Sequence, residues 1–166
     1  AARTVGGGLA FAYCLRGDMA RLLIPEPQKP GCTAGLWEHS CFEAFVGVRG
    51  QPAYREFNFS PSGHWAAYAF SAYRQRDEAL RLLVPPRITA RLSAGRLELA
   101  AVVPAVVLPP MAGAATLQVG LAAVVEAIDT IDGSHSYWAL RHPAALPDFH
   151  HRASFALELA PPREPA

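Results

Sequence analysis

The chain has 166 residues, of which 51% are hydrophobic and 17% charged, with 15 Lys and Arg against 14 Asp and Glu. This length suits one domain with a core that needs no disulfide or metal, and the composition excludes disorder over most of the chain. A net charge of +1 without a basic block argues against nucleic-acid partners, and no apolar run approaches a membrane span. We expect residues 1–160 to form a single domain and residues 161–166 a tail.

The cysteines carry information about the compartment. Cys14, Cys32 and Cys41 are an odd number at wide spacing, which argues against a disulfide framework or a zinc site. Free thiols fit a reducing compartment, and the first residues show no signal-peptide pattern. These features weigh towards a cytoplasmic location without deciding it.

The first half of the chain is a series of short alternating segments separated by Pro and Gly. Residues 9–15 and 19–24 predict a hairpin, and the Pro-rich residues 25–35 predict a loop. Tight turns then separate three further predicted strands, which cover residues 36–48, 53–60 and 64–70.

The second half continues the pattern after one predicted short helix over residues 72–83. The β-branched residues of 116–127 favour a strand over a helix, with Gly120 as a candidate bulge. The remaining predicted elements are a hairpin of residues 87–92 and 96–103, a loop or single helical turn at 104–113, and strands at 134–140 and 155–159. The fold class is therefore all-β: an antiparallel β-sandwich of jelly-roll or immunoglobulin-like type, with at most one or two short helices.

Alternation divides the strands at residues 41–48 and 53–60 into two faces. One face is apolar and is expected to form the core; it carries Phe42, Ala44, Val46, Val48, Phe57 and Phe59. If the two strands pair across their short turn, Glu43, Glu56 and Asn58 share the opposite, outer face. Tyr54 and Phe45 lie between these polar residues, and Trp37 lies at the edge.

Aromatic rings beside carboxylates and an amide are typical of a sugar-binding face. The rings stack on the apolar C–H face of a pyranose, and the oxygens accept hydrogen bonds from its hydroxyl groups. The alternative is an ordinary solvated face on which the carboxylates pair with Arg55, Arg74 or Arg21. Two carboxylates also suggest glycoside hydrolysis as an activity, but nothing marks one as the acid and the other as the base.

Histidines gather late in the chain, and they leave haem binding open. His150 and His151 stand beside Asp148 on a predicted loop, and their spacing matches neither a helical HxxxH pattern nor a zinc finger. Ordering of the loop through hydrogen bonds to Asp148 is the simpler interpretation. For haem, Met19 or Met111 would have to join one of the late histidines as axial ligands.

Four segments together resemble a known family. They are residues 36–45 with Trp37 and a Glu-x-Phe strand, residues 54–63 with Glu and Asn before Pro-x-Gly, residues 137–140 and residues 147–150. The chain resembles the bacterial DOMON-like proteins, which are relatives of the family-9 carbohydrate-binding modules. The resemblance spans roughly residues 9–159 and implies a β-sandwich that binds sugars or, in some branches, haem.

The resemblance implies roles for individual residues. Trp37 and Trp138 would supply stacking planes, and Glu43, Glu56 and Asn58 would hold sugar hydroxyls. Arg74 and His150 are expected at the rim of the site. The modules carry two aspartates after the Trp where this chain has Glu38 and His39, which weakens the transfer of their calcium site.

The sequence thus favours a non-catalytic module that binds a carbohydrate or sugar-like small molecule, with no required cofactor. A b-type haem domain and a protein-interaction module without a small ligand are the alternatives, and a homodimer is left open. The sequence does not decide whether Trp37 faces the ligand or caps the core.

Overall fold

A computed structural model describes residues 1–111, 113, 115–128 and 135–161. Its longer strands are β2 (Leu9–Arg16), β3 (Cys41–Val48), β4 (Tyr54–Phe59), β5 (Trp65–Ala72), β7 (Arg87–Ser93), β8 (Arg96–Val103), β9 (Leu117–Glu126) and β10 (His135–Ala139). Its short elements are strands β1 (Ala2–Arg3), β6 (Gln75–Arg76) and β11 (Leu157–Leu159), and 3₁₀ turns η1 (Met19–Arg21), η2 (Leu36–Glu38), η3 (Ala105–Val107) and η4 (Arg152–Ser154). No helix in this part of the chain is long and apolar enough to cross a membrane.

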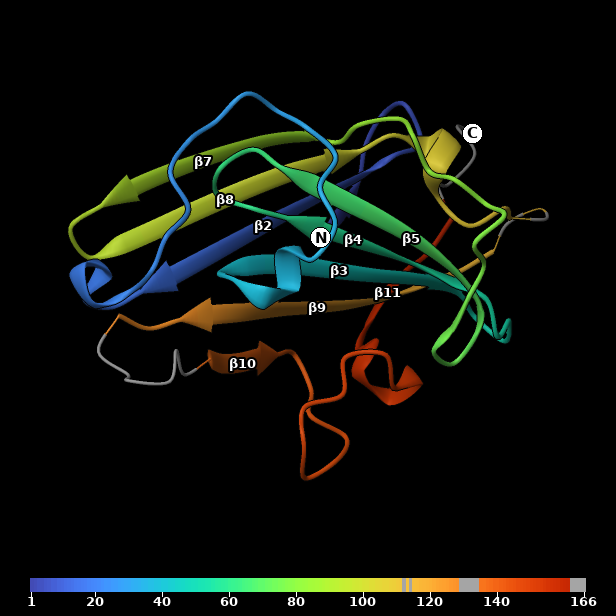
Figure 1. Cartoon of the computed structure of the whole chain (residues 1–166). Coiled ribbons are helices and arrows are strands. Elements are labelled where there is room, and N and C mark those ends of the chain that lie inside the picture. Colours follow the sequence, from blue (N-terminus) through green and yellow to red (C-terminus); the bar gives the residue numbers. More distant parts are fainter. Residues whose placement is uncertain (112, 114, 129–134, 162–166) are drawn as a thin grey trace.

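The strands form two antiparallel sheets packed face to face, as the sequence predicts (Figure 1). The four-stranded sheet has the order β1-β2-β8-β7, and the seven-stranded sheet has the order β10-β9-β3-β4-β5-β6, with β11 also paired to β9. The described architecture is therefore a β-sandwich, with helical structure limited to single 3₁₀ turns.

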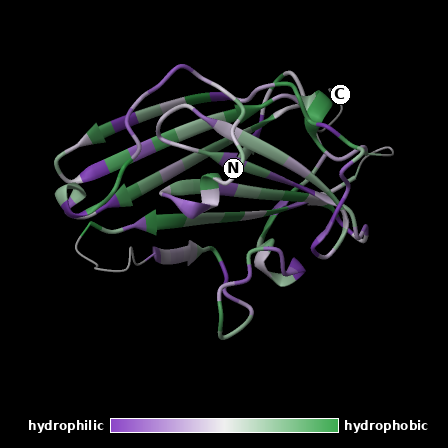
Figure 2. Cartoon of the chain, in the orientation of Figure 1, coloured by the Kyte–Doolittle hydropathy of each residue, from purple (hydrophilic) through white to green (hydrophobic). Residues whose placement is uncertain are grey.

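The core lies between the sheets and follows the predicted alternation. The inner face of the seven-stranded sheet carries Phe42, Ala44, Val46, Phe57 and Phe59, all buried. These residues meet Leu97, Leu99, Ala101 and Val103 of β8 and Leu9 and Phe11 of β2. Figure 2 shows the result as strands on which hydrophobic green bands alternate with paler or purple ones.

The outer face of the seven-stranded sheet is the side turned away from the four-stranded sheet, and it has a second apolar cluster. Cys41, Phe45, Tyr54, Tyr68 and Phe70 are its main members. It is covered by Leu36 of η2 and by residues 140–156, which we call the C-terminal cover. In Figure 1 this orange-to-red segment loops out after β10 and returns through η4 to β11.

Two glycines leave room for the C-terminal cover to pack against the outer face. A side chain at Gly120 on β9 would meet the ring of Phe155 at 3.2 Å and the Ser154 carbonyl oxygen at 3.3 Å. A side chain at Gly47 on β3 would collide with the guanidinium of Arg152, which donates to the Val48 carbonyl oxygen at 2.6 Å. The bulge predicted at Gly120 is wrong, because β9 pairs with β3 in unbroken register there.

Two predicted elements are also wrong. Residues 9–15 do not pair with residues 19–24; β2 pairs with β1 and β8 instead. Residues 72–83 form no helix, because β5 extends to Ala72 and Arg74 takes a left-handed φ of 55° that turns the chain into β6. Ser134, the first residue of another predicted strand, and residues 162–166 of the predicted tail lie outside the described residues.

Candidate functional site

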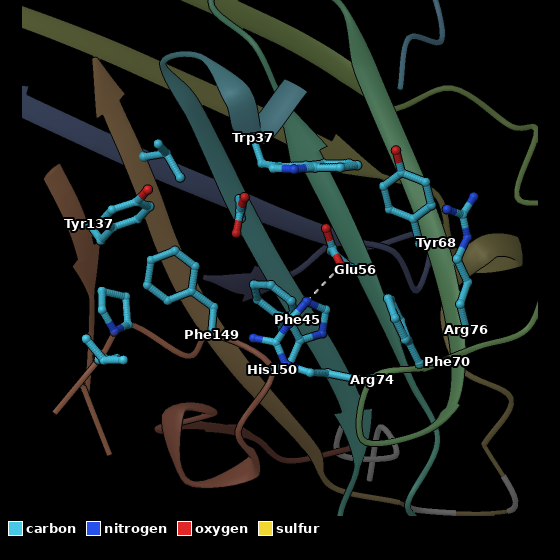
Figure 3. Close-up of a pocket in the computed structure, with 14 residues that line it drawn as sticks. Trp37, Phe45, Glu56, Tyr68, Phe70, Arg74, Arg76, Tyr137, Phe149 and His150 are labelled. Carbon is cyan, nitrogen blue, oxygen red and sulfur yellow. Dashed lines mark ion pairs between the residues drawn. The ribbon is translucent and has the colours of Figure 1, made fainter. Parts of the chain in front are cut away.

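The outer face holds a cavity of about 740 Å³, within the size range of small-molecule sites. We call it the outer-face cavity. It is lined by Trp37, Glu43, Phe45, Glu56, Tyr68, Phe70, Arg74, Arg76, Val124, Tyr137, Leu146, Pro147, Phe149 and His150. Figure 3 shows these side chains converging from the sheet on one side and from the C-terminal cover on the other.

Strand register brings the polar residues of the floor together. Glu43 on β3 lies directly opposite Asn58 on β4, and Glu56 lies opposite Phe45 on one side and Tyr68 on the other. Residues two apart on a strand share a face, and cross-strand partners share it too. The predicted grouping of Glu43, Glu56 and Asn58 on one face is thus present in the structure.

This polar group is far more buried than the sequence suggests. Glu43 is 4%, Glu56 6% and Asn58 0% exposed. The Asn58 amide Nδ2 donates to Glu56 Oε1 at 2.7 Å, and its Oδ1 accepts a weak hydrogen bond from the Cys41 thiol at 3.8 Å. Asn58 therefore lies behind the cavity wall and orients Glu56, while both glutamates line the cavity.

Burial makes both glutamates weak acids. Burial, and then the charge of Glu56, raises the pKa of Glu43 to about 8. Burial also raises the pKa of Glu56 to about 7, against the opposing effects of the Asn58 hydrogen bond and of Arg76 and Arg74. Near neutral pH the floor therefore contains a mostly protonated Glu43, which can donate a hydrogen bond, beside a partly ionised Glu56.

His150 closes one side of the cavity as a neutral ring. Burial, and then the charge of Arg74, lowers its pKa to about 4. Tyr54 Oη accepts from the Arg74 backbone N–H at 3.1 Å, so its hydroxyl proton is free to bond His150 Nδ1 at 2.8 Å. This network assigns the ring proton to Nε2, which faces Glu56 Oε2 at 3.6 Å (dashed line in Figure 3).

Asp148 fastens the C-terminal cover to the rim. Its carboxylate accepts from Tyr73 Oη at 2.6 Å and from Arg74 Nη2 at 3.0 Å, so it ties the cover to the turn between β5 and β6. Partial burial alone would raise the pKa of Asp148, but these two hydrogen bonds hold it below its usual value. The simpler sequence interpretation, that His150 or His151 orders the loop through hydrogen bonds to Asp148, holds only for the backbone: the His151 N–H donates to the Asp148 carbonyl oxygen at 3.3 Å, whereas the Asp148 carboxylate contacts the Tyr73–Arg74 turn.

Trp37 lies over the outer-face cavity and does not cap the core. The backbone of η2 directs the neighbouring Leu36 into the second apolar cluster, whereas Trp37 stays 43% exposed and lines the cavity. Its ring meets Tyr68 edge-on, with 5.9 Å between the ring centroids. Figure 3 shows the indole above Glu56, across the cavity from His150.

Trp138 does not line the outer-face cavity. It pairs with Ala123 of β9 and lines a separate groove between the sheets with Tyr13, Phe42 and Leu140. Its neighbour Tyr137 pairs with Val124 and lines the outer-face cavity, where Trp138 was expected. The structure therefore gathers Trp37, Glu43, Glu56, Arg74 and His150 at the cavity, places Asn58 behind it and separates Trp138 from it.

Sequence reasoning missed several cavity residues. Tyr68 and Phe70 share the face of Glu56 and Tyr54 through the register of β4 with β5, so extending the alternation across the turn at 61–63 would have found them. Arg76 stands on the two-residue strand β6, where a helix was predicted. No local pattern places Phe149, because it reaches the cavity through the long-range packing of the C-terminal cover.

The residues weighed for haem or calcium do not converge. Met19 is buried between the sheets and Met111 contacts Arg3, so neither lines the cavity that contains His150. Among the described residues, no group of three or more His, Cys, Asp and Glu side chains could hold a metal ion. The described site does not fit a Met–His haem pair or a carboxylate calcium site.

Comparison with known proteins gives one likeness. No protein-family model matches the chain, and no curated protein matches it. A solved structure from Bacteroides uniformis, described as a "putative carbohydrate-binding protein", is similar with a TM-score of 0.59 and 17% sequence identity over 92% of this chain and 72% of that chain. The likeness is one of fold.

Proposed function

We propose that the protein is a non-catalytic module that binds a carbohydrate or sugar-like small molecule in the outer-face cavity. The observation that carries this proposal is the pairing of buried hydrogen-bonding groups with aromatic walls. Glu43 and Glu56 form the polar floor, and Trp37, Tyr68 and Tyr137 stand around it. The resemblance to DOMON-like proteins and family-9 carbohydrate-binding modules, and the fold shared with the Bacteroides protein, support the same ligand class.

The chemistry of a pyranose matches these groups. Its C–H faces pack against aromatic rings, and its hydroxyl groups both donate and accept hydrogen bonds. An ionised Glu56 accepts from a hydroxyl, a protonated Glu43 donates to one, and His150 offers an N–H. Because these groups are already held in place by burial and by Asn58 and Tyr54, binding needs little reorganisation.

Two exposed tryptophans allow a matched test. Trp37 lines the cavity, whereas Trp138, which is 60% exposed, lies in a separate groove. Wild-type protein, Trp37→Ala and Trp138→Ala are applied to a glycan array, and the dissociation constant of each bound sugar is measured by calorimetry. We expect Trp37→Ala to weaken binding about tenfold, the value of one lost stacking plane, and Trp138→Ala to leave it unchanged.

Two outcomes would contradict the proposal. If folded wild-type protein bound no glycan on the array, a protein-interaction role without a small ligand would be favoured. If a sugar bound but only Trp138→Ala weakened it, the binding site would be the groove between the sheets.

A further inference from the structure

Glu43 is a buried acid without a partner. Its side chain is 4% exposed and lines the outer-face cavity. Among the described residues no hydrogen bond or ion pair reaches its carboxyl group; only its backbone carbonyl is used, by the Tyr13 hydroxyl at 2.8 Å. Burial of a carboxyl group without a donor or a cation is unfavourable. A ligand that supplied the missing partner would therefore relieve this cost.

Glu56 is the diagonal neighbour of Glu43 across the pairing of β3 with β4, on the same face, and it lines the same cavity. The charge of Glu56 raises the pKa of Glu43, so the two carboxyl groups repel each other when both are ionised. Among the described residues, the groups in direct contact with the Glu56 carboxyl are neutral: the Asn58 amide and the His150 ring. A cation between the two glutamates would remove their repulsion and pair with both.

The arginines at the rim do not supply this cation. Arg74 is paired with Asp148, with 3.0 Å between Nη2 and Oδ1, and Arg76 is paired with Glu78, with 3.1 Å between Nε and Oε1. Arg76 also lies over the ring of Tyr68, 4.3 Å from its centroid. Among the described residues, neither arginine forms an ion pair with Glu43 or Glu56, although the charges of both act on Glu56 from a distance and lower its pKa.

The walls of the cavity also suit a cation on a sugar ring. Trp37, Tyr68 and Tyr137 present aromatic surfaces beside the two glutamates, and aromatic faces attract cations as well as C–H groups. From these contacts we propose that the preferred ligand is an amino sugar whose ammonium group sits between Glu43 and Glu56 while its ring packs on Trp37. This inference rests on the proposed function, since it names the class of sugar that the same cavity takes.

The inference makes a distinct prediction about pH. Below about pH 7 the free site holds protons on both glutamates, so an ammonium ligand must displace protons to bind, and its affinity rises with pH by up to about tenfold per pH unit for each proton displaced. Above about pH 8 the affinity falls again as the amine itself loses its proton, by analogy with ordinary amino groups. The other titratable or charged groups facing this pair are Tyr13 on β2, Cys41 on β3, Tyr54 on β4, Tyr68 on β5, Arg74, Arg76, Tyr137, Asp148 and His150.

The experiment compares three β-1,4-linked trisaccharides that differ only at the second carbon. They are made of glucose, N-acetylglucosamine and glucosamine, and thus carry a hydroxyl, a neutral amide and an ammonium group. Calorimetry from pH 5 to pH 8.5, in buffers of different ionisation enthalpy, gives the dissociation constant and the number of protons released. We expect the glucosamine trimer to bind at least tenfold more tightly than the glucose trimer at pH 7.5, with proton release. The two neutral trimers should show no such rise in affinity with pH.

Glu43→Gln keeps the shape of the side chain and removes its charge. It should abolish the preference, because it weakens binding of the glucosamine trimer far more than it weakens binding of the glucose trimer. The matched control is Glu98→Gln on the other sheet, where the exposed Glu98 pairs with Arg96. Glu98→Gln should change the affinity for neither trimer. Thermal melting checks that the wild-type protein and both variants are folded.

The failures of the two proposals are distinguishable. Equal affinity for the glucose and glucosamine trimers, or no binding of the glucosamine trimer while the glycan array shows another bound sugar, would overturn the inference and leave the proposed function standing. A preference for glucosamine that survives in Glu43→Gln would overturn the assigned position of the ammonium group. Absence of binding to every glycan would overturn both proposals.

Discussion

The inner and outer faces of the seven-stranded sheet are built from the same strands but are covered differently. On the inner face, Phe42, Phe57 and Phe59 meet a second sheet, and the contact is continuous and apolar. On the outer face, the cover is a short 3₁₀ turn and a loop from the far end of the chain, and the contact leaves a cavity with two glutamates in it. One face therefore supplies stability, and the other carries groups whose burial opposes it.

The composition of each face follows from its cover. A packed sheet excludes water and tolerates only apolar side chains, whereas an incomplete cover leaves space for a ligand to contact polar groups. The outer face also needs Gly47 and Gly120, where Arg152 and Phe155 approach the strands. Buried polar residues that a stable fold does not require are typical of binding sites.

Removal of an inner-face ring should have the largest effect. Phe59 is fully buried and its ring lies 5.9 Å from that of Phe11, centroid to centroid. Phe59→Ala should lower the free energy of unfolding by about 3–5 kcal/mol, because it leaves a void in a rigid core. Urea unfolding measures this loss. The outer-face variant Phe149→Ala should lose less than half as much, and equal losses would show that the two faces do not differ in this way.

The buried glutamates should make the protein less stable as the pH rises. In the unfolded chain their carboxyl groups lose protons near pH 4.5, whereas in the folded protein they hold them to about 8 for Glu43 and about 7 for Glu56. Over this range the folded protein binds more protons, so the free energy of unfolding falls. His150 opposes this between its folded pKa of about 4 and its ordinary 6.5. The fall is therefore steepest between about pH 6.5 and pH 7, and it ends above about pH 8.

Glu43→Gln should remove much of the fall in the free energy of unfolding with rising pH. At pH 8.5 we expect it to be more stable than wild type by roughly 2–4 kcal/mol, since a tenfold change in an acid constant is worth about 1.4 kcal/mol. At pH 4.5 the two proteins should be alike. Urea unfolding at both pH values is the measurement, with the exposed Glu98→Gln as control. A variant that was no more stable at pH 8.5 would mean that Glu43 is not buried as a weak acid.

The sequence predicted the two faces well because alternation is a local property. Period-two patterns in residues 41–48 and 53–60 placed Phe42 and Phe57 inside and Glu43 and Glu56 outside, and the register of β3 with β4 confirms this grouping. The hairpin of β7 and β8 followed from local turn residues in the same way. Both the strand faces and this hairpin depend on residues close together in the chain, so the sequence predicted them.

Features that depend on distant segments were not predictable. The outer face is covered by η2 and by the C-terminal cover, and the alternation of the strands predicts neither, so Glu43 and Asn58 were expected to be exposed. Trp138 was assigned to the site because the resemblance to family-9 modules implies a second stacking tryptophan, yet its pairing with Ala123 turns it to the other face. The helix expected at 72–83 depended on composition, which does not reveal the left-handed turn at Arg74.

The smallest change in stability should come from the contact that fastens the C-terminal cover. Asp148 accepts from Tyr73 and Arg74 at the protein surface, and exposed ion pairs contribute about 1 kcal/mol or less. Asp148→Asn should therefore alter the urea midpoint only slightly. It should nevertheless weaken binding of the glucose and glucosamine trisaccharides several-fold, because Phe149 and His150 are held against the cavity by this contact. Asp18→Asn, which changes another loop carboxylate that accepts a backbone hydrogen bond, should leave binding unchanged. Equal affinity in Asp148→Asn and wild type would show that the cover keeps its position without this contact, and the difference between the two faces would then lie in the strands alone.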